Sequence, residues 1–186
     1  MWQKLARLIY YKWMGWKAFV TVPDMEKCII CVAPHTSNWD FIIAELFYTA
    51  IGRKAGFLMK RSWFFFPLGI LLKAIGGVPV DRSRKTSLVE QIVKRSKHSG
   101  HFHLAITPEA TRSLNPNWKQ GFYYMALGAE LPIVLYAIDY KHKAIYGEKV
   151  IYPTGNVEEE MREIKLYFKT FGKNARHLKK FTVGDI

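Results

Sequence analysis

A histidine and a carboxylate lie five residues apart where an expected strand passes into an expected helix. The segment Pro34–Asp40 reads Pro-His-Thr-Ser-Asn-Trp-Asp and follows a short apolar run. Ser37 is a suitable helix cap, which would put Asp40 in the first turn and leave His35 just outside it. A histidine oriented by a carboxylate is a general-base arrangement. A structural histidine bonded to a capping aspartate fits the same spacing, so the spacing alone leaves both interpretations open.

Two further polar clusters follow expected strands. The first, Gly76–Arg82, ends in an Asp-Arg pair, Asp81 and Arg82, whose planar guanidinium can bind a phosphate with two hydrogen bonds. The second lies in residues 106–113, where a strand opens into a loop with one carboxylate, two hydroxyls and an arginine, among them Glu109, Thr111 and Arg112. An ordinary surface ion pair or polar loop fits each cluster taken singly. Because ligand sites of α/β proteins gather at the carboxyl ends of strands, we expect the three clusters to meet.

The elements that must position these clusters alternate between strand and helix. Apolar runs and their flanking residues predict strands over residues 27–33, 56–60, 78–80, 102–107 and 133–140, with a β-rich stretch following to about residue 153. Helical periodicity and stop signals predict helices over residues 39–51, 62–75, 87–96, 118–129 and a closing helix to Phe171, started by a capping box of Asn156 and Glu159. This alternation predicts a single-domain α/β fold with a mixed, mostly parallel sheet flanked by helices.

The first residues predict an amphipathic helix over residues 2–19. Its apolar stripe consists of Trp2, Leu5, Ile9, Trp13 and Trp16. All charged residues of the segment are basic. A tryptophan-rich stripe beside a basic face is typical of a helix that lies in the membrane interface. An amphipathic helix that docks on its own core is the alternative. The Phe64–Phe66 run is expected either in the core or against the membrane.

Composition limits the class of partner. Lys and Arg number 28 against 15 acidic residues, which gives a net charge of +13. Such an excess predicts a polyanionic partner, namely nucleic acid, an anionic membrane or a phosphorylated substrate. No nucleic-acid-binding motif is present. The longest apolar stretch, residues 63–72, is about half the ~20 residues that a spanning helix needs, so no segment is expected to cross a bilayer.

The remaining metal-ligand residue types have simpler interpretations. Cys28 and Cys31 fall three apart in an expected strand, so they would face opposite sides and could not easily share a metal. We expect both to be buried thiols, in keeping with a reduced, cytoplasmic setting. His98, His101 and His103 have no matching set of acidic or thiol ligands nearby, so no metal site is predicted there.

Together these residues resemble the glycerophospholipid acyltransferases, the family that contains lysophosphatidic acid acyltransferase. Residues 35–40 match the family's HX4D motif, and residues 77–82, 108–112 and 131–133 are similar to its second, third and fourth blocks. The blocks occur in the family's order over residues 28–140, and Lys60 and Lys119–Gly121 are also similar. Ala110 stands where the family usually has glycine, which could alter the loop or narrow the acceptor pocket.

The resemblance implies a role for each of these residues. His35 would take a proton from an acceptor hydroxyl, Asp40 would stabilise the imidazolium, and the alkoxide would attack an acyl thioester without an acyl-enzyme. Arg82 and Arg112 would hold the acceptor's phosphate, while Lys60 would assist the phosphate or the developing oxyanion. The same acceptor pocket would contain Asp81, Glu109 and Thr111.

The resemblance also implies a function and a location. We expect acyl transfer to a lysophospholipid, above all 1-acyl-sn-glycerol-3-phosphate, to give phosphatidic acid. Acyl-CoA or acyl-carrier protein would be the donor, and no other cofactor is expected. Residues 1–22 would be a membrane-surface segment and residues 23–186 the acyltransferase domain, peripheral on the cytoplasmic face of a membrane. Alternatives are another lysolipid acceptor, such as an amino-acid-headed lipid or a lipid A precursor, and a non-catalytic membrane-binding or nucleic-acid-binding protein.

Overall fold

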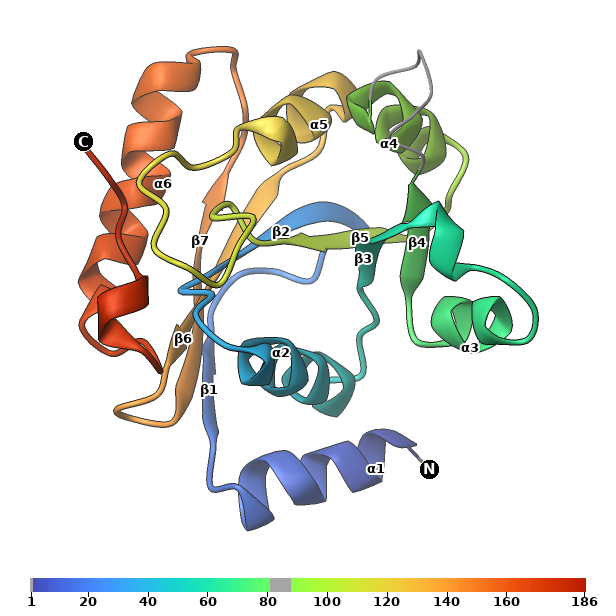
Figure 1. Cartoon of the computed structure of the whole chain (residues 1–186), viewed down its shortest axis with the longest axis horizontal. Coiled ribbons are helices and arrows are strands. Elements are labelled where there is room, and N and C mark those ends of the chain that lie inside the picture. The colour runs from blue at the N-terminus through green and yellow to red at the C-terminus, as the bar shows by residue number, and fades with distance from the viewer. Residues whose placement is uncertain (1, 81–87) are drawn as a thin grey trace.

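A mixed sheet runs through the middle of the protein (Figure 1). The computed structural model describes residues 2–80 and 88–186, except for the side chain of Lys60, and over these ranges the sheet has seven strands in the order β1-β7-β6-β2-β5-β3-β4. The strands are β1 Lys17–Val20, β2 Lys27–Ala33, β3 Gly56–Lys60, β4 Gly77–Val80, β5 Phe102–Ile106, β6 Ile133–Asp139 and β7 Ala144–Ile151. The strands from β6 to β4 are parallel, whereas β7 runs antiparallel to β6 and carries β1 at its edge. The expected mixed, mostly parallel sheet is therefore confirmed.

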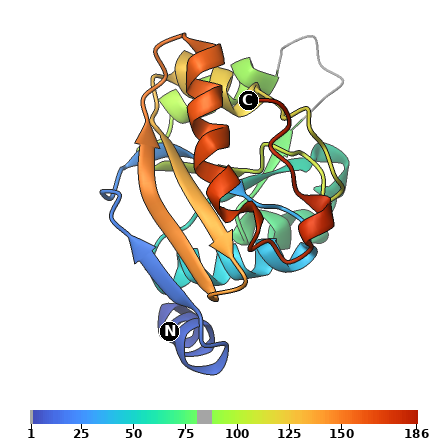
Figure 2. The same cartoon turned by 90° about the vertical axis from the view of Figure 1, so that its left-hand side faces the viewer.

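Helices cover both faces of this sheet (Figures 1 and 2). The α-helices are α1 Trp2–Arg7, α2 Asn38–Ala50, α3 Leu68–Ala74, α4 Leu88–Lys97, α5 Gly121–Ala129 and α6 Val157–Gly172. Shorter helical turns are the π-helical η1 Leu8–Trp13 and the 3-10 turns η2 Arg61–Trp63 and η3 Leu178–Lys180. One face packs against α2, on which α1 docks in turn, the other packs against α4, α5 and α6, and α3 contacts β4 at the edge.

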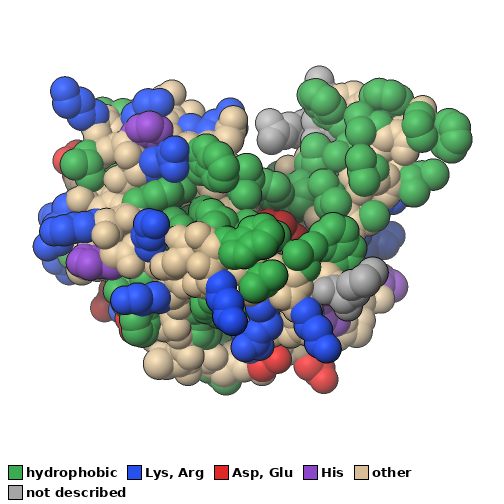
Figure 3. Space-filling model, turned by 90° about the horizontal axis from the view of Figure 1, so that it is seen from below, with side chains coloured by type: hydrophobic (Ala, Val, Ile, Leu, Met, Phe, Trp, Pro, Cys, Tyr) green, Lys and Arg blue, Asp and Glu red, His purple; other side chains and the backbone are tan. Residues whose placement is uncertain are grey.

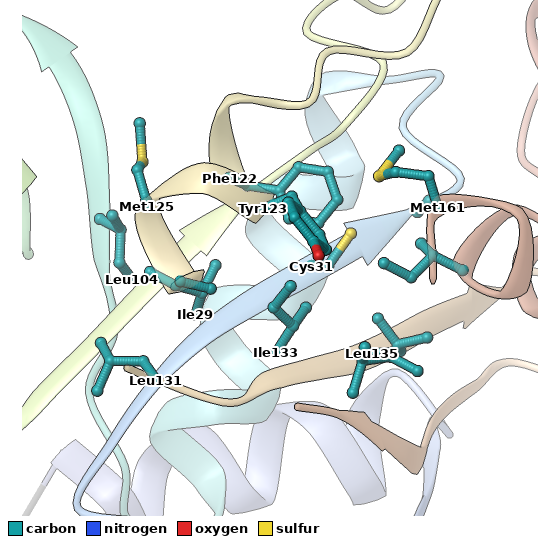
Figure 4. Packing of buried hydrophobic residues seen from close by; sticks show 14 of the residues in the cluster. Ile29, Cys31, Leu104, Phe122, Tyr123, Met125, Leu131, Ile133, Leu135 and Met161 are labelled. Atoms are coloured by element: carbon teal, nitrogen blue, oxygen red, sulfur yellow. The ribbon is translucent and has the colours of Figure 1, made fainter. Parts of the chain in front are cut away.

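Alternating side chains of β2 supply both halves of the core. Ile29 and Cys31 belong to the cluster under α5 and α6 (Figure 4), whereas Cys28, Ile30 and Val32 belong to the cluster under α2. A parallel strand covered on both faces needs apolar residues at every position, which explains why this run is continuously apolar. The prediction of buried cysteines on opposite faces is confirmed, and burial raises the pKa of the Cys28 thiol to about 12.

The N-terminal helix is shorter than the sequence predicted. It ends at Trp13, Gly15 follows with a φ of +67°, and β1 then pairs with β7. The prediction of helix over residues 14–19 is therefore wrong. The periodicity of one segment cannot show that a distant strand, β7, has backbone groups available to pair with it. In the structure, residues 17–20 form their backbone hydrogen bonds with β7 and not within a helix. The domain division after residue 22 stays a prediction.

The helix α1 and its continuation η1 dock on α2 by a narrow face. Ala6 and Tyr10 are buried there, and Tyr10 packs against Phe47. Trp2 and Trp13 face outward, with 77 % and 72 % of their surface exposed. Trp2 and Trp13 of the expected apolar stripe therefore stay exposed, and a different face of the helix, with Ala6 and Tyr10, contacts the core.

Two other local predictions differ from the structure. Residues 62–75 form no continuous helix: η2 ends at Trp63 and α3 begins after Pro67, because proline cannot donate the backbone hydrogen bond that a helix interior requires. The capping box at Asn156 is also absent. The Asn156 side chain accepts no backbone N–H of α6, and its amide nitrogen donates to Glu159 Oε2 at 2.6 Å.

Candidate active site

The expected polar clusters meet where β2 ends. Strand β2 lies between β5 and β6, and all three are parallel, so their carboxyl ends share one edge of the sheet. The loop after β2 carries His35, the loop after β5 carries Glu109 and Arg112, and β6 leads directly into Tyr140. A site at this edge is the usual place for ligands in α/β proteins.

The start of α2 folds the histidine onto the aspartate. Ser37 Oγ accepts a hydrogen bond from the Trp39 N–H at 3.2 Å, and Asp40 Oδ2 accepts from the N–H groups of Ser37 at 2.7 Å and Thr36 at 2.6 Å. This capping box turns the chain sharply before α2. His35 Nδ1 consequently lies 3.4 Å from Asp40 Oδ2. The contact that the spacing predicted is present.

A tyrosine bonds to the other oxygen of Asp40. Tyr140 Oη donates to Asp40 Oδ1 at 2.6 Å. Burial, together with the neighbouring Asp40 charge, raises the pKa of Tyr140 well above its usual value, so the phenol stays protonated as a donor. Sequence reasoning missed Tyr140, because it lies 100 residues from Asp40 and becomes a neighbour only when β6 pairs with β2. A tyrosine at the carboxyl end of a strand was the only local signal.

Glu109 holds the backbone of the histidine. Its Oε1 accepts from the His35 N–H at 2.7 Å, and its side chain is buried. Burial raises the pKa of Glu109 to about 7, although the hydrogen bond from His35 opposes the shift. Its Oε2 is buried with no hydrogen-bond partner among the described residues. Glu109 thus links the loop after β5 to the loop that carries His35, a contact that the sequence did not indicate.

Basic and hydroxyl side chains border the other side of His35. Arg112 donates through Nη1 to Asn38 Oδ1, and its side chain is exposed. Thr111 and Lys119 lie on the wall of the same cavity as Arg112. The sequence indicated Lys119 only through the family resemblance, and the structure places it on the wall of the cavity that Arg112 also lines.

Some predicted residues need separate mention. Asp81 and Arg82 lie outside the described residues, as does the side chain of Lys60, whose backbone ends β3. Ala110 has a φ of +55°, a left-handed conformation that glycine adopts more easily, and its methyl group lies on the cavity wall. The substitution of the usual glycine therefore has a visible conformational consequence.

A cavity of about 810 Å³ extends from this site along α2. His35, Thr111 and Arg112 lie at one part of its wall, and the rest of the lining is mostly apolar: Phe41, Ala44, Phe57, Met59, Ala105, Tyr136 and Ile138 are among it. From Asp40 to Tyr48 the helix advances about 12 Å at 1.5 Å per residue. A lipid chain spans roughly half of a ~30 Å hydrocarbon core, so most of one chain fits alongside α2. Figure 3 shows the surface hollowed between the lobe that carries α3 and the rest of the protein.

His103, outside the site, is held by structural hydrogen bonds. His103 is buried; its Nδ1 is 2.7 Å from Tyr48 Oη and its Nε2 is 2.6 Å from the Met25 carbonyl oxygen. Both ring nitrogens are therefore engaged, although His101 lies on the same face, with ring centroids 4.1 Å apart. Within residues 2–80 and 88–186, no group of three His, Cys, Asp or Glu side chains is placed to hold a metal ion.

Comparisons with known proteins show the family and the fold. A family model described as Acyltransferase matches residues 20–139, which is more than half of the chain. The fold is similar to that of the 1-acyl-sn-glycerophosphate (LPA) acyltransferase PlsC from Thermotoga maritima, with a TM-score of 0.60 and 16 % identity over 90 % of this chain and 77 % of that one. No curated protein matches significantly by sequence. The chain belongs to the acyltransferase family.

Proposed function

We propose that this protein transfers a fatty acyl group from an acyl thioester to the free hydroxyl of 1-acyl-sn-glycerol-3-phosphate, giving phosphatidic acid. One observation above all supports this function: the His35–Asp40 pair opens onto a long apolar cavity with cations beside it. A base, a place for an acyl chain and a place for a phosphate are the parts that this reaction needs.

The proposed chemistry follows from the orientation of His35. Because Nδ1 faces Asp40, Nε2 is left to accept the proton of the acceptor hydroxyl. The resulting alkoxide attacks the thioester carbonyl, the C–S bond of the tetrahedral intermediate breaks, and the thiolate leaves with the proton that His35 had accepted. Asp40 stabilises the imidazolium between these steps. Proton transfer by a positioned general base such as His35 typically contributes about 10²–10⁴ in rate.

The choice of a phosphate-bearing acceptor rests on charge. Arg112 and Lys119 lie on the cavity wall beside the base, and guanidinium groups bind phosphate with paired hydrogen bonds. Arg82 is proposed as a further ligand by resemblance alone. The name of the T. maritima enzyme, which has the same fold, indicates the same acceptor class.

We place the enzyme peripherally on the cytoplasmic face of a membrane. Over the described part of the chain, no helix has the length and hydropathy to span a bilayer. Trp2 and Trp13 are exposed on α1 and η1, and Phe66, Ile70 and Leu71 are exposed on and beside α3. Figure 3 shows hydrophobic side chains gathered over the α3 lobe and near the centre of the face seen from below, the side on which α1 lies in Figure 1, with lysines and arginines beside them. This combination suits an anionic interface, where the lysolipid also resides.

An acceptor panel tests the proposed function. Purified protein is given a long-chain acyl thioester in mixed micelles with lysophosphatidic acid, an uncharged monoacylglycerol, or an amino-acid-headed lysolipid, and each diacyl product is measured by mass spectrometry. The proposal expects kcat/KM to be highest for lysophosphatidic acid and to fall at least tenfold in Arg112→Ala, while Arg95→Ala, an exposed arginine of α4, leaves it unchanged. Preference for another acceptor, unaffected by Arg112, would contradict it.

A further inference from the structure

A basic segment near the C-terminus lies beside the site and outside the family match, which ends at residue 139. Its cations are Lys173, Arg176, Lys179 and Lys180, all of them exposed. Among the described residues, none of these side chains forms an ion pair with a carboxylate. Figure 3 shows lysine and arginine side chains gathered on the side away from the α3 lobe, where this segment runs in Figure 1.

Hydrogen bonds fix this segment to the catalytic loop. The Tyr140 N–H donates to the Asn174 carbonyl at 2.9 Å, and the Asn174 amide donates to Asp139 Oδ2 at 2.8 Å. The His177 N–H donates to Thr36 Oγ1 at 3.3 Å. Asn174 is itself buried. The segment is therefore attached both to the end of β6 and to the residue after the catalytic histidine.

Arg176 is held against two aromatic rings of the site. Its guanidinium carbon lies 5.6 Å from the Trp39 ring centroid and 5.4 Å from that of Tyr140. Trp39 precedes Asp40 in the chain, and Tyr140 bonds to Asp40. The cation is thus one residue removed from the proposed catalytic pair, on the β6 side of it, whereas Arg112 lies on the β5 side.

We propose that the donor is an acyl-CoA and that residues 173–180, with Trp39, bind the phosphorylated nucleotide of its coenzyme A. This inference rests on the proposed function and names the donor for it. Two substrates must meet at His35, and the β5 side is occupied by the acceptor's ligands, so the β6 side is left for the donor. The long pantetheine arm of coenzyme A would join the thioester at His35 to the nucleotide phosphates at residues 173–180.

The side chains of residues 173–180 and Trp39 favour a nucleotide as the ligand. Exposed cations attract phosphates, and an arginine stacked on a half-exposed tryptophan offers a flat surface for a purine ring. A phospholipid headgroup has no aromatic ring that could stack on that surface. An acidic carrier protein would use the charges alone and would not depend on Trp39.

Donor truncation tests this assignment. Steady-state kinetics would compare an acyl-CoA with the acyl thioester of N-acetylcysteamine, which has the same reacting bond but no nucleotide. We expect Arg176→Ala and the double variant Lys179→Ala/Lys180→Ala each to raise KM for the acyl-CoA about tenfold and to leave kcat/KM for the truncated donor within twofold. Lys97→Ala, which removes an exposed cation of α4, is the matched control and should change neither.

A binding measurement keeps the test independent of activity. Calorimetry with adenosine 3′,5′-bisphosphate should show binding to wild type and to His35→Ala, weakened about tenfold by Arg176→Ala and by Trp39→Ala. Failure of wild type to bind this nucleotide overturns the donor assignment, even if acyl transfer is observed. Equal losses with both donors, a raised KM for the acceptor alone, or a loss confined to binding of anionic vesicles would also overturn it. If no acceptor is acylated, a positive binding result still stands and the proposed function alone fails.

Discussion

Tyr140 donates a 2.6 Å hydrogen bond to Oδ1 of Asp40, while Oδ2 of the same carboxylate accepts two backbone N–H groups and faces His35. Each oxygen of this buried aspartate is therefore held by donors from a different part of the chain. A carboxylate fixed in this way orients the imidazole and stabilises its charged form without needing to move during the reaction.

Removing the tyrosine hydroxyl should slow the chemical step. We expect Tyr140→Phe to lower kcat about tenfold, a loss of about 1.4 kcal/mol in transition-state stabilisation, and to leave KM for both substrates nearly unchanged. Steady-state kinetics check this, and Tyr124→Phe, at an exposed position of α5, serves as the control. If kcat is unaffected, Tyr140 does not position Asp40 for catalysis.

Glu109 should make stability depend on pH. Burial raises its pKa from 4.5 to about 7, so between these values the folded protein keeps a proton that the unfolded chain releases. The free energy of unfolding should then fall as pH rises through this range, by about 3 kcal/mol in total at 1.36 kcal/mol per pKa unit. Glu109→Gln keeps an oxygen to accept from His35 and removes the titration.

Urea unfolding at several pH values measures this effect. The stability of Glu109→Gln relative to wild type should increase between pH 4.5 and pH 8, and Glu158→Gln, at an exposed position of α6, should run parallel to wild type. Parallel curves for Glu109→Gln as well would mean that this carboxyl is not buried with a raised pKa.

The backbone at Ala110 predicts a stabilising substitution. Ala110→Gly should raise the free energy of unfolding by about 0.5 to 1 kcal/mol, since relief of the left-handed strain exceeds the added entropy of the unfolded chain. Glu130→Gly, at a φ of +56° beyond α5, should stabilise similarly. Only Ala110 lies on the cavity wall, so Ala110→Gly alone should alter KM for the acceptor. Chemical denaturation and kinetics on both variants test the two halves of this prediction.

The exposed tryptophans should govern membrane binding. We expect Trp2→Ala/Trp13→Ala to lower partitioning into anionic vesicles at least tenfold, because each indole loses roughly 1.5 kcal/mol or more of burial. Vesicle sedimentation measures the effect. Tyr152→Ala, which removes an exposed ring after β7, is the control. Unchanged partitioning of the double variant would show that this helix does not hold the protein to the membrane.

Local sequence patterns predict the elements whose bounds are set by their own residues, and fail for elements that depend on distant partners. Strands β2 and β3 have the predicted bounds. The run of β2 is continuously apolar and is followed by Pro34, whereas β3 begins at Gly56, so proline or glycine marks one boundary of each strand. Strand β1 was missed, because it exists only through its pairing with β7. The apolar content of residues 62–75 likewise predicts one continuous helix, whereas Pro67 interrupts it and α3 begins only at Leu68.

The same division holds in the site. The contact of His35 with Asp40 could be predicted, because the capping box that forms it lies within a few residues. Tyr140, the bond from the His35 backbone to Glu109, and the stacking of Arg176 on Trp39 join segments far apart in sequence. These contacts depend on the strand order around β2, which no local pattern contains.

The most direct test of the central claim is the rate of acyl transfer from a thioester to lysophosphatidic acid by wild type and His35→Ala, with His98→Ala as a control at an exposed histidine of the α4 loop. We predict that wild type and His98→Ala are active and that the rate of His35→Ala is at least a hundredfold lower. A His35→Ala variant as fast as an active wild type would contradict the account, because no base would then be needed at the end of β2.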